Sequence, residues 1–138
     1  MSNRTLVIAK PDAVERGLVG EIIRRFEQKQ LTLDAVELRL LTREIAEAHY
    51  AEHQGKGFFN DLIDFITRSP VILMVVSGPD AQPVVRRMMG TTNPAEAAAG
   101  TIRGDFAIET TENLVHGSDS SESAESEIAR FFPQLAAK

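Results

Sequence analysis

The six consecutive apolar residues at 71–76, VILMVV, constrain the fold of this chain more than any other stretch. A membrane-spanning helix needs roughly 20 apolar residues, so this run is too short to cross a bilayer. A strand that is apolar on both faces has to be covered on both faces. The run therefore predicts a strand in the middle of a sheet.

Most of the remaining segments have the periodicity of strands or helices. We predict strands at 4–10, 31–41 and 113–116, and helices at 17–30, 42–53, 58–68 and 81–90. A last helix follows Asp119, which we pair with Glu122 as its cap. This order contains the β-α-β-β-α-β pattern of a ferredoxin-like fold. The prediction is a single α+β domain over 1–138, with an antiparallel sheet covered by helices and a C-terminal helix.

Composition excludes several classes of protein. The 138 residues carry a formal net charge of -5, which argues against a general nucleic-acid coat and against attachment to anionic lipid by charge alone. Cysteine is absent, so disulfides and thiol catalysis are excluded. The N-terminus lacks the cleavage pattern of a signal peptide. We expect a cytoplasmic protein that has no membrane partner and no specific nucleic-acid partner.

The segment 91–106, TTNPAEAAAGTIRGDF, shows no sustained periodicity and contains Asn-Pro and two glycines. A loop of that length inside a compact domain is usually functional. Neither a third glycine for G-x-G-x-x-G nor the spacing of a Walker loop is present near residues 55–57. If the ligand is a phosphate, side chains have to bind it.

The stretch HYAEH at 49–53 matches the metalloprotease pattern H-x-x-E-H. It puts His49 and His53 one helical turn apart, but zinc catalysis also needs a third ligand and an open coordination position. A metal hydrolase that uses this pair is the alternative enzyme. The simpler interpretation is the polar face of a surface helix.

His116 is the sharpest candidate for chemistry, because a neutral imidazole is a good nucleophile near pH 7. It can carry a phosphoryl group if its second ring nitrogen is held by a hydrogen bond, which Glu127 with Ser118 can supply. A structural, hydrogen-bonded histidine is the competing interpretation. Three cations are scattered along the chain: Lys10, Arg86 and Arg103. Taken singly, each reads as an ordinary solvated charge. If the fold brings them together, they could instead bind one triphosphate.

The chain closely resembles nucleoside diphosphate kinases in three segments, VIAKPDAVERGLVGEII, TNPAEAAAGTIRGDF and NLVHGSDSSESAESEI. The similarity runs from about Arg4 to Phe132, with the three segments in the order of the family. The resemblance implies a ferredoxin-like domain with a long nucleotide-binding loop. It also implies a Mg²⁺-bound nucleotide as substrate and ping-pong transfer of a γ-phosphoryl group through phosphohistidine, with broad base specificity. Such an enzyme would maintain the pools of nucleoside triphosphates.

The resemblance also implies roles for individual residues. His116 matches the nucleophile, Glu127 and Ser118 match its orienting pair, and Tyr50 matches a tyrosine beside it. The positions that match the nucleotide site are Lys10 and Asn113 for sugar and phosphate, Arg86, Thr92 and Arg103 for phosphates, and Phe58, Leu62 and Thr110 for the base. No protein ligand for a metal is implied, since nucleotide phosphates and water would hold most of the Mg²⁺.

The partners implied are nucleoside di- and triphosphates, ATP and GTP among them, and further copies of the chain. Members of the family form hexamers or tetramers from a common dimer, and we expect a hexamer. The chain ends with FFPQLAAK and lacks a long C-terminal extension, which resembles bacterial members. Gly57 stands where members commonly have proline, which predicts a looser nucleotide-gripping segment. A nucleotide-binding module that has lost turnover is the other alternative.

Overall fold

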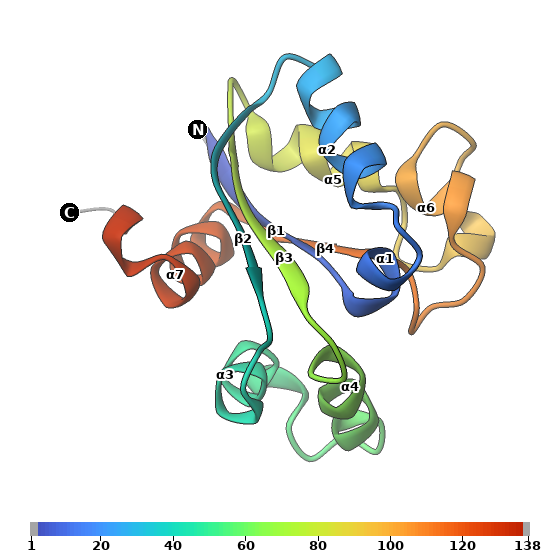
Figure 1. Ribbon diagram of the computed structural model, residues 1–138, viewed down its shortest axis with the longest axis vertical. Helices are drawn as coiled ribbons and strands as arrows, with labels where there is room; N and C mark the ends of the chain where they lie inside the picture. The colour runs from blue at the N-terminus through green and yellow to red at the C-terminus, as the bar shows by residue number, and fades with distance from the viewer. Residues whose placement is uncertain (1–2, 137–138) are drawn as a thin grey trace.

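The computed structural model describes residues 3–136 as an antiparallel sheet with helices on both faces (Figure 1). The strands are β1 (Arg4–Ala9), β2 (Thr32–Arg39), β3 (Val71–Ser77) and β4 (Val115–Gly117). They form a four-stranded sheet in the order β2-β3-β1-β4, and every neighbouring pair is antiparallel. This order confirms the predicted ferredoxin-like α+β fold.

The apolar run at 71–76 lies in β3, between β1 and β2, as predicted. Its side chains alternate between two cores: Leu73 and Val75 belong to one, Met74 and Val76 to the other. All four side chains are fully buried, which explains why no polar residue interrupts the run. No helix among residues 3–136 is both long enough and apolar enough to span a membrane.

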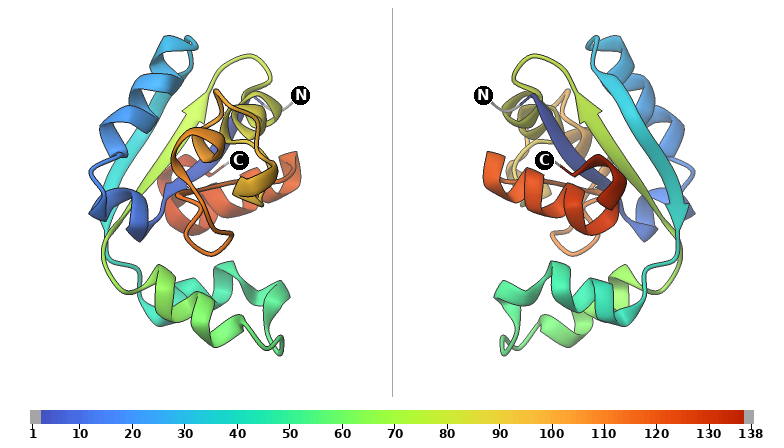
Figure 2. Two further views of the ribbon diagram at one scale, coloured as in Figure 1. Left: turned by 90° about the vertical axis from the view of Figure 1, so that its right-hand side faces the viewer. Right: turned by 90° about the vertical axis from the view of Figure 1, so that its left-hand side faces the viewer.

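The helices divide between the two faces of the sheet (Figures 1 and 2). They are α1 (Pro11–Glu15), α2 (Val19–Gln28), α3 (Arg43–His49), α4 (Phe59–Ile66), α5 (Ala81–Met89), α6 (Ile102–Phe106) and α7 (Ser121–Phe131), with short 3-10 turns η1 (Ala51–His53), η2 (Pro94–Glu96) and η3 (Pro133–Leu135). α2 and α5 cover one face through Phe26 and Val85. α7 covers the other face with Ile128 and Phe131, and α3 and α4 pack into the same core at one end of β2 and β3 (Figure 1).

Two predicted helices differ from the structure. The helix predicted over 42–53 stops at His49, because Tyr50 leaves helical geometry and the 3-10 turn η1 follows. The last helix is capped by Ser120, whose side chain accepts the backbone N–H of Ser123, and not by Asp119. It ends at Phe131, and η3 begins at Pro133, a residue that cannot supply the N–H of a continuing helix.

The long segment after α5 is more ordered than its sequence predicts. It contains η2, capped by the Asn93 side chain, and α6, capped by the Thr101 hydroxyl, which accepts from the backbone N–H of Gly104. α1, directly after β1, was not predicted either. All three are too short to show an apolar period, so only their capping residues and prolines could have indicated them.

Candidate active site

The short edge strand β4 carries His116 opposite Ile8 of β1. On either side of it, Val115 and Gly117 face α5, and a Cβ on Gly117 would lie 2.7 Å from the Met89 sulfur. Because side chains alternate along a strand, the His116 ring faces the opposite way, toward α3 and α7. Close packing against α5 is therefore a sufficient reason for glycine at 117.

Glu127 of α7 reaches the His116 ring from the side. Its Oε1 lies 3.0 Å from Nε2 of His116 and accepts the Ser118 hydroxyl at 2.7 Å. Burial works to raise the pKa of Glu127, but the hydrogen bond and charge of His116, the nearby His49 and the Ser118 hydroxyl outweigh it. The pKa of Glu127 is therefore below its usual value, and the group is a carboxylate at neutral pH.

The carboxylate fixes the tautomer of His116. An ionised carboxylate only accepts hydrogen bonds, so Nε2 has to carry the proton in this contact. In the neutral ring the other nitrogen, Nδ1, then keeps its lone pair. When the ring is neutral, this contact therefore leaves Nδ1 free to act as a nucleophile.

His49 and Tyr50, at the end of α3, form an aromatic wall next to this pair. The His49 ring stands edge-on to the His116 ring, with centroids 4.6 Å apart, and is at the same centroid distance from Tyr50. Burial, with the neighbouring His116, lowers the pKa of His49 to about 3, so the ring is neutral. Burial, with Glu127, raises the pKa of Tyr50. The Tyr50 hydroxyl makes no hydrogen bond within residues 3–136.

A cavity of about 280 Å³ opens in front of His116. Tyr50, Arg86 and Thr92 line it together with His116 and Glu127. Arg86 Nη1 donates to the Gly117 carbonyl at 3.2 Å, and this contact places a cation beside the strand that carries the histidine. The cavity thus combines an imidazole, a cation and hydroxyl groups, a set suited to phosphoryl transfer.

A second cavity, of about 360 Å³, is lined by predicted base and sugar contacts. Phe58 and Leu62, at the start of α4 and in its second turn, face Thr110 and Lys10. Phe58 is 50% exposed, a large fraction for an aromatic side chain. Its ring therefore offers an open face to a planar ligand.

Asn113 connects the two cavities. Its Oδ1 accepts Lys10 Nζ at 2.8 Å, and its Nδ2 donates to the Thr92 carbonyl at 3.0 Å. Burial, and then the charge of Arg103, lowers the pKa of Lys10 to about 8, against the opposing effect of Asp12. The ammonium group of Lys10 thus lies where the two cavities meet, and it loses its proton at a lower pH than the ammonium group of an ordinary lysine.

Arg103, predicted as a phosphate contact, binds backbone carbonyls in the structure. Its guanidinium donates to the carbonyls of Gly90, Asn113 and Val115, at 3.0, 3.3 and 2.6 Å. The side chain is 4% exposed and lines neither of the two cavities. Burial, and then Arg86, lowers its pKa to about 10, so it remains a cation. In this structure Arg103 fixes the loop that surrounds the cavities.

Asp12 supports the site and was missed in the sequence. Its Oδ2 accepts the backbone N–H of Leu114 at 3.0 Å. Leu114 has a φ of 76°, a left-handed conformation that is uncommon for a bulky residue. The turn at Leu114 lies between Asn113 and the strand β4, which carries His116. Burial, more than its neighbours, raises the pKa of Asp12. Only the position of Asp12, just after a strand and Pro11, could have indicated such a role.

The histidine pair of the metal-hydrolase alternative does not form a metal-spaced group among residues 3–136. Among residues 3–136, the only set of three side chains spaced to hold a metal ion is His49, His116 and Glu127. This set excludes His53, whose ring lies near Phe58. The helix break after His49 is the physical reason, because the two histidines of HYAEH no longer belong to one helix.

Known proteins resemble this chain over nearly its whole length. The family model described as nucleoside diphosphate kinase matches residues 3–136. A nucleoside diphosphate kinase from Mycobacterium tuberculosis is 58% identical over 134 residues, which cover 96% of this chain and 98% of the relative. One from Saccharopolyspora erythraea is 57% identical over 136 residues, 98% of this chain and all of the relative.

A solved structure gives the same result. The halophilic nucleoside diphosphate kinase from Halobacterium salinarum in complex with CDP superimposes with a TM-score of 0.92 and 46% identity, covering 96% of this chain and 88% of that one. Fold and sequence agree. The chain is therefore a phosphotransferase of bacterial type that belongs to the nucleoside diphosphate kinase family.

Proposed function

We propose that this enzyme transfers the γ-phosphoryl group of a nucleoside triphosphate to a nucleoside diphosphate through a phosphohistidine at Nδ1 of His116. The observation that carries the proposal is the 3.0 Å contact of Nε2 with Glu127, which leaves Nδ1 with the lone pair. Nδ1 attacks the γ-phosphorus as the bond to the β,γ-bridging oxygen breaks. The ring keeps its proton on Nε2 and becomes cationic, and the Glu127 carboxylate stabilises that charge.

The remaining charges position the phosphates. Arg86 and Thr92 line the cavity in front of His116, and Lys10 stands at its junction with the second cavity. Phosphoryl transfer depends mainly on positioning and charge neutralisation, so a cation and a hydroxyl at this place favour the in-line geometry. Tyr50 closes one side and limits the positions open to the γ-phosphate.

Mg²⁺ is the cofactor we propose, bound mainly by the nucleotide. Mg²⁺ prefers six oxygen ligands, including phosphates and water. Glu52 and Asp119 add carboxylate oxygens to the cavity lining, so a hydrated ion fits there. The set of three ligands found among residues 3–136, in contrast, contains two imidazole nitrogens, which do not suit Mg²⁺. When bound, the ion would neutralise phosphate charge.

The nucleotide base is proposed to stack on Phe58, with Leu62 below it and Thr110 opposite. Stacking discriminates weakly, because every base has a π-face. Broad use of ATP, GTP and other nucleotides, including deoxy forms, follows from this mode of binding. With that breadth the enzyme would keep the pools of triphosphates in balance.

Two measurements test the proposal. Incubation with ATP labelled at the γ position should mark the protein with an acid-labile, base-stable phosphate, and His116→Ala should abolish both label and turnover. Label that survives this substitution refutes the assigned nucleophile. Transfer from ATP to a different nucleoside diphosphate separates an enzyme from a module that only binds nucleotides. Activity that needs zinc would instead favour the hydrolase alternative.

Self-association is proposed to use β2, an edge strand of the sheet. Val36, Leu38 and Leu40 are 47%, 61% and 58% exposed, an unusual set of apolar side chains next to unpaired strand edges. Pairing of two such edges would give a dimer, from which we propose a hexamer, with a tetramer as the alternative. Sedimentation determines the state, and Leu38→Lys should shift it to smaller species.

The proposal includes a single domain over 1–138 and a cytoplasmic location. The match of one family model to residues 3–136 supports the first, and the absence of cysteine is consistent with the second. The net charge of -5 gives no reason to propose a nucleic-acid partner. Fractionation of cells that express the chain tests the location.

A further inference from the structure

We propose that His49, His116 and Glu127 form an inhibitory site for Zn²⁺ or a similar transition-metal ion. One ring nitrogen of each histidine and one carboxylate oxygen of Glu127 lie within 4.8 Å of one another. The three residues come from α3, β4 and α7, so the fold itself brings them together. Two imidazoles and a carboxylate make a donor set that suits Zn²⁺.

Two of the three donors are already close to metal spacing. At Zn–N and Zn–O distances of about 2.1 Å, tetrahedral ligands are about 3.4 Å apart. Nε2 of His116 and Oε1 of Glu127 are 3.0 Å apart, so the ion would take the place of the proton between them. Nε2 of His49 is buried and makes no hydrogen bond within residues 3–136, and it is the nitrogen we assign as third ligand. A small rotation of this ring completes the set.

Binding would switch the tautomer of His116. A neutral imidazole that coordinates a metal through one nitrogen carries its proton on the other. Zn²⁺ at Nε2 therefore moves the proton to Nδ1, and Nδ1 loses the lone pair that the proposed function needs. The inhibitory effect rests on that proposed function, whereas metal binding does not. Because the ion binds behind the ring, raising the nucleotide concentration should not relieve inhibition.

Arg130 disfavours metal binding at His49, and its replacement provides a sensitive test. Its Nη1 lies 3.5 Å from Nδ1 of His49, a long contact that favours the His49 proton on Nε2. Metal binding at Nε2 requires the proton on Nδ1, facing the guanidinium. Arg130→Gln removes this positive charge and offers an amide oxygen that can accept from Nδ1. The substitution should therefore tighten Zn²⁺ binding, by about threefold or more.

The experiment is a titration of the purified full-length protein with Zn²⁺ alone, by calorimetry, without nucleotide. We expect a single ion per chain. His49→Gln should weaken binding more than about tenfold, since even loss of an outer-shell partner costs 10–100-fold. His53→Gln, in the same HYAEH segment, is the matched control and should bind Zn²⁺ as the parent does. Thermal melting of each variant checks that it is folded.

Nitrogen NMR shifts of the His116 ring give a readout that a merely structural role of His49 would not change. Zn²⁺ should move the proton from Nε2 to Nδ1 in the parent but not in His49→Gln. The proposal is overturned if Zn²⁺ does not bind without nucleotide, if His53→Gln abolishes binding, or if Nδ1 stays unprotonated in the metal complex. Absence of label on His116 with intact zinc binding would refute the proposed function alone.

Discussion

Replacement of Glu127 by Gln isolates the charge that the mechanism assigns to this residue. Both hydrogen bonds at Glu127 are accepted by Oε1. In Glu127→Gln the amide oxygen can accept the same two donors, and the amide nitrogen replaces only Oε2. The variant thus keeps the orientation of His116 and loses the negative charge beside it.

The structure sets the expected magnitude. A full positive charge on the ring, about 4 Å from the carboxylate, would interact with it by about 4 kcal/mol at an effective dielectric constant of about 20. With about half of that charge developed in the transition state, the carboxylate contributes about 2 kcal/mol. The neutral amide still stabilises the ring by about 0.5–1 kcal/mol. Phosphorylation of His116 should slow by about tenfold. Glu127→Ala, which also removes the acceptor, should slow it by roughly one to two orders of magnitude.

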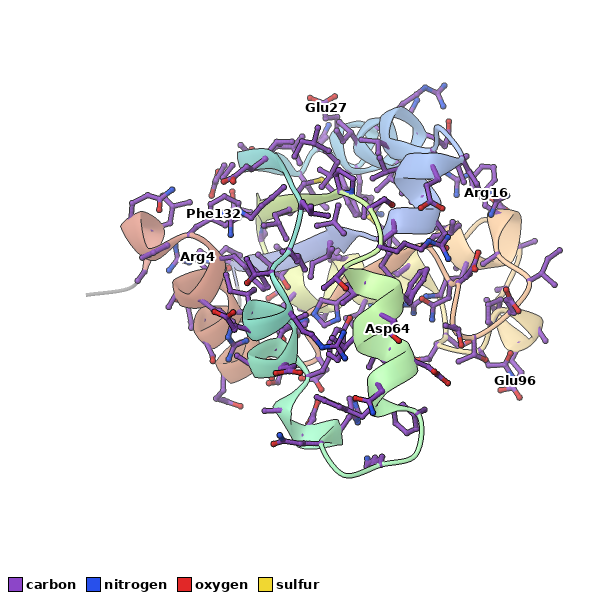
Figure 3. The ribbon with its side chains drawn as sticks, turned by 60° about the horizontal axis from the view of Figure 1, so that its bottom comes forward. Arg4, Arg16, Glu27, Asp64, Glu96 and Phe132 are labelled. Carbon is purple, nitrogen blue, oxygen red and sulfur yellow. The ribbon has the colours of Figure 1, made fainter. Side chains whose placement is uncertain are left out.

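Rapid-quench measurement of the first turnover with γ-labelled ATP determines this rate without product release. The matched control is Glu125→Gln, which removes the same charge from the same helix. Glu125 pairs with Arg4, which is labelled in Figure 3; the two side chains are 2.6 Å apart, and Glu125 is 44% exposed. Its loss should change stability by at most about 1 kcal/mol and leave the rate unchanged. Equal rates for the two variants would refute the assignment of charge stabilisation to Glu127.

Three further predictions address other parts of the site. The pKa of Lys10, lowered to about 8, means that its positive charge is lost as pH rises through that value, so kcat/KM should fall above about pH 8; a flat profile to pH 10 would exclude a role for this charge. Phe58→Ala should raise KM by roughly tenfold for purine and pyrimidine nucleotides alike, since stacking contributes about 1–3 kcal/mol per base; an effect on one base only would contradict stacking. Gly104→Ala puts a Cβ against the Ala98 carbonyl oxygen and should cost about 1–3 kcal/mol in thermal unfolding, whereas Gly57→Ala, with open space around it, should not.

The sheet was predictable because hydrophobic periodicity reports burial. The run at 71–76 lies in β3, and the segments of β1 and β2 were located to within about two residues. Boundaries set by single residues were not predictable in this way. Nothing in the period of 42–53 indicates that the helix stops before Tyr50. This break decides which residues His49 contacts, so its position against His116 could not be inferred from the sequence.

The loop around the cavities shows why periodicity fails at the site. Its shape depends on polar side chains that bind backbone groups: Arg103 donates to three carbonyls, Asn113 donates to the Thr92 carbonyl, and Asp12 accepts the N–H of Leu114. A buried backbone group without such a partner would be costly, so these contacts determine the path of the chain. The pattern of apolar residues in the sequence does not indicate these contacts. Because the same contacts fix the loop at Asn113, which also accepts Lys10, and place β4 beneath the first cavity, the residues that shape the loop also position His116. A kinetic defect in Arg103 variants is therefore expected even without any contact between Arg103 and a phosphate.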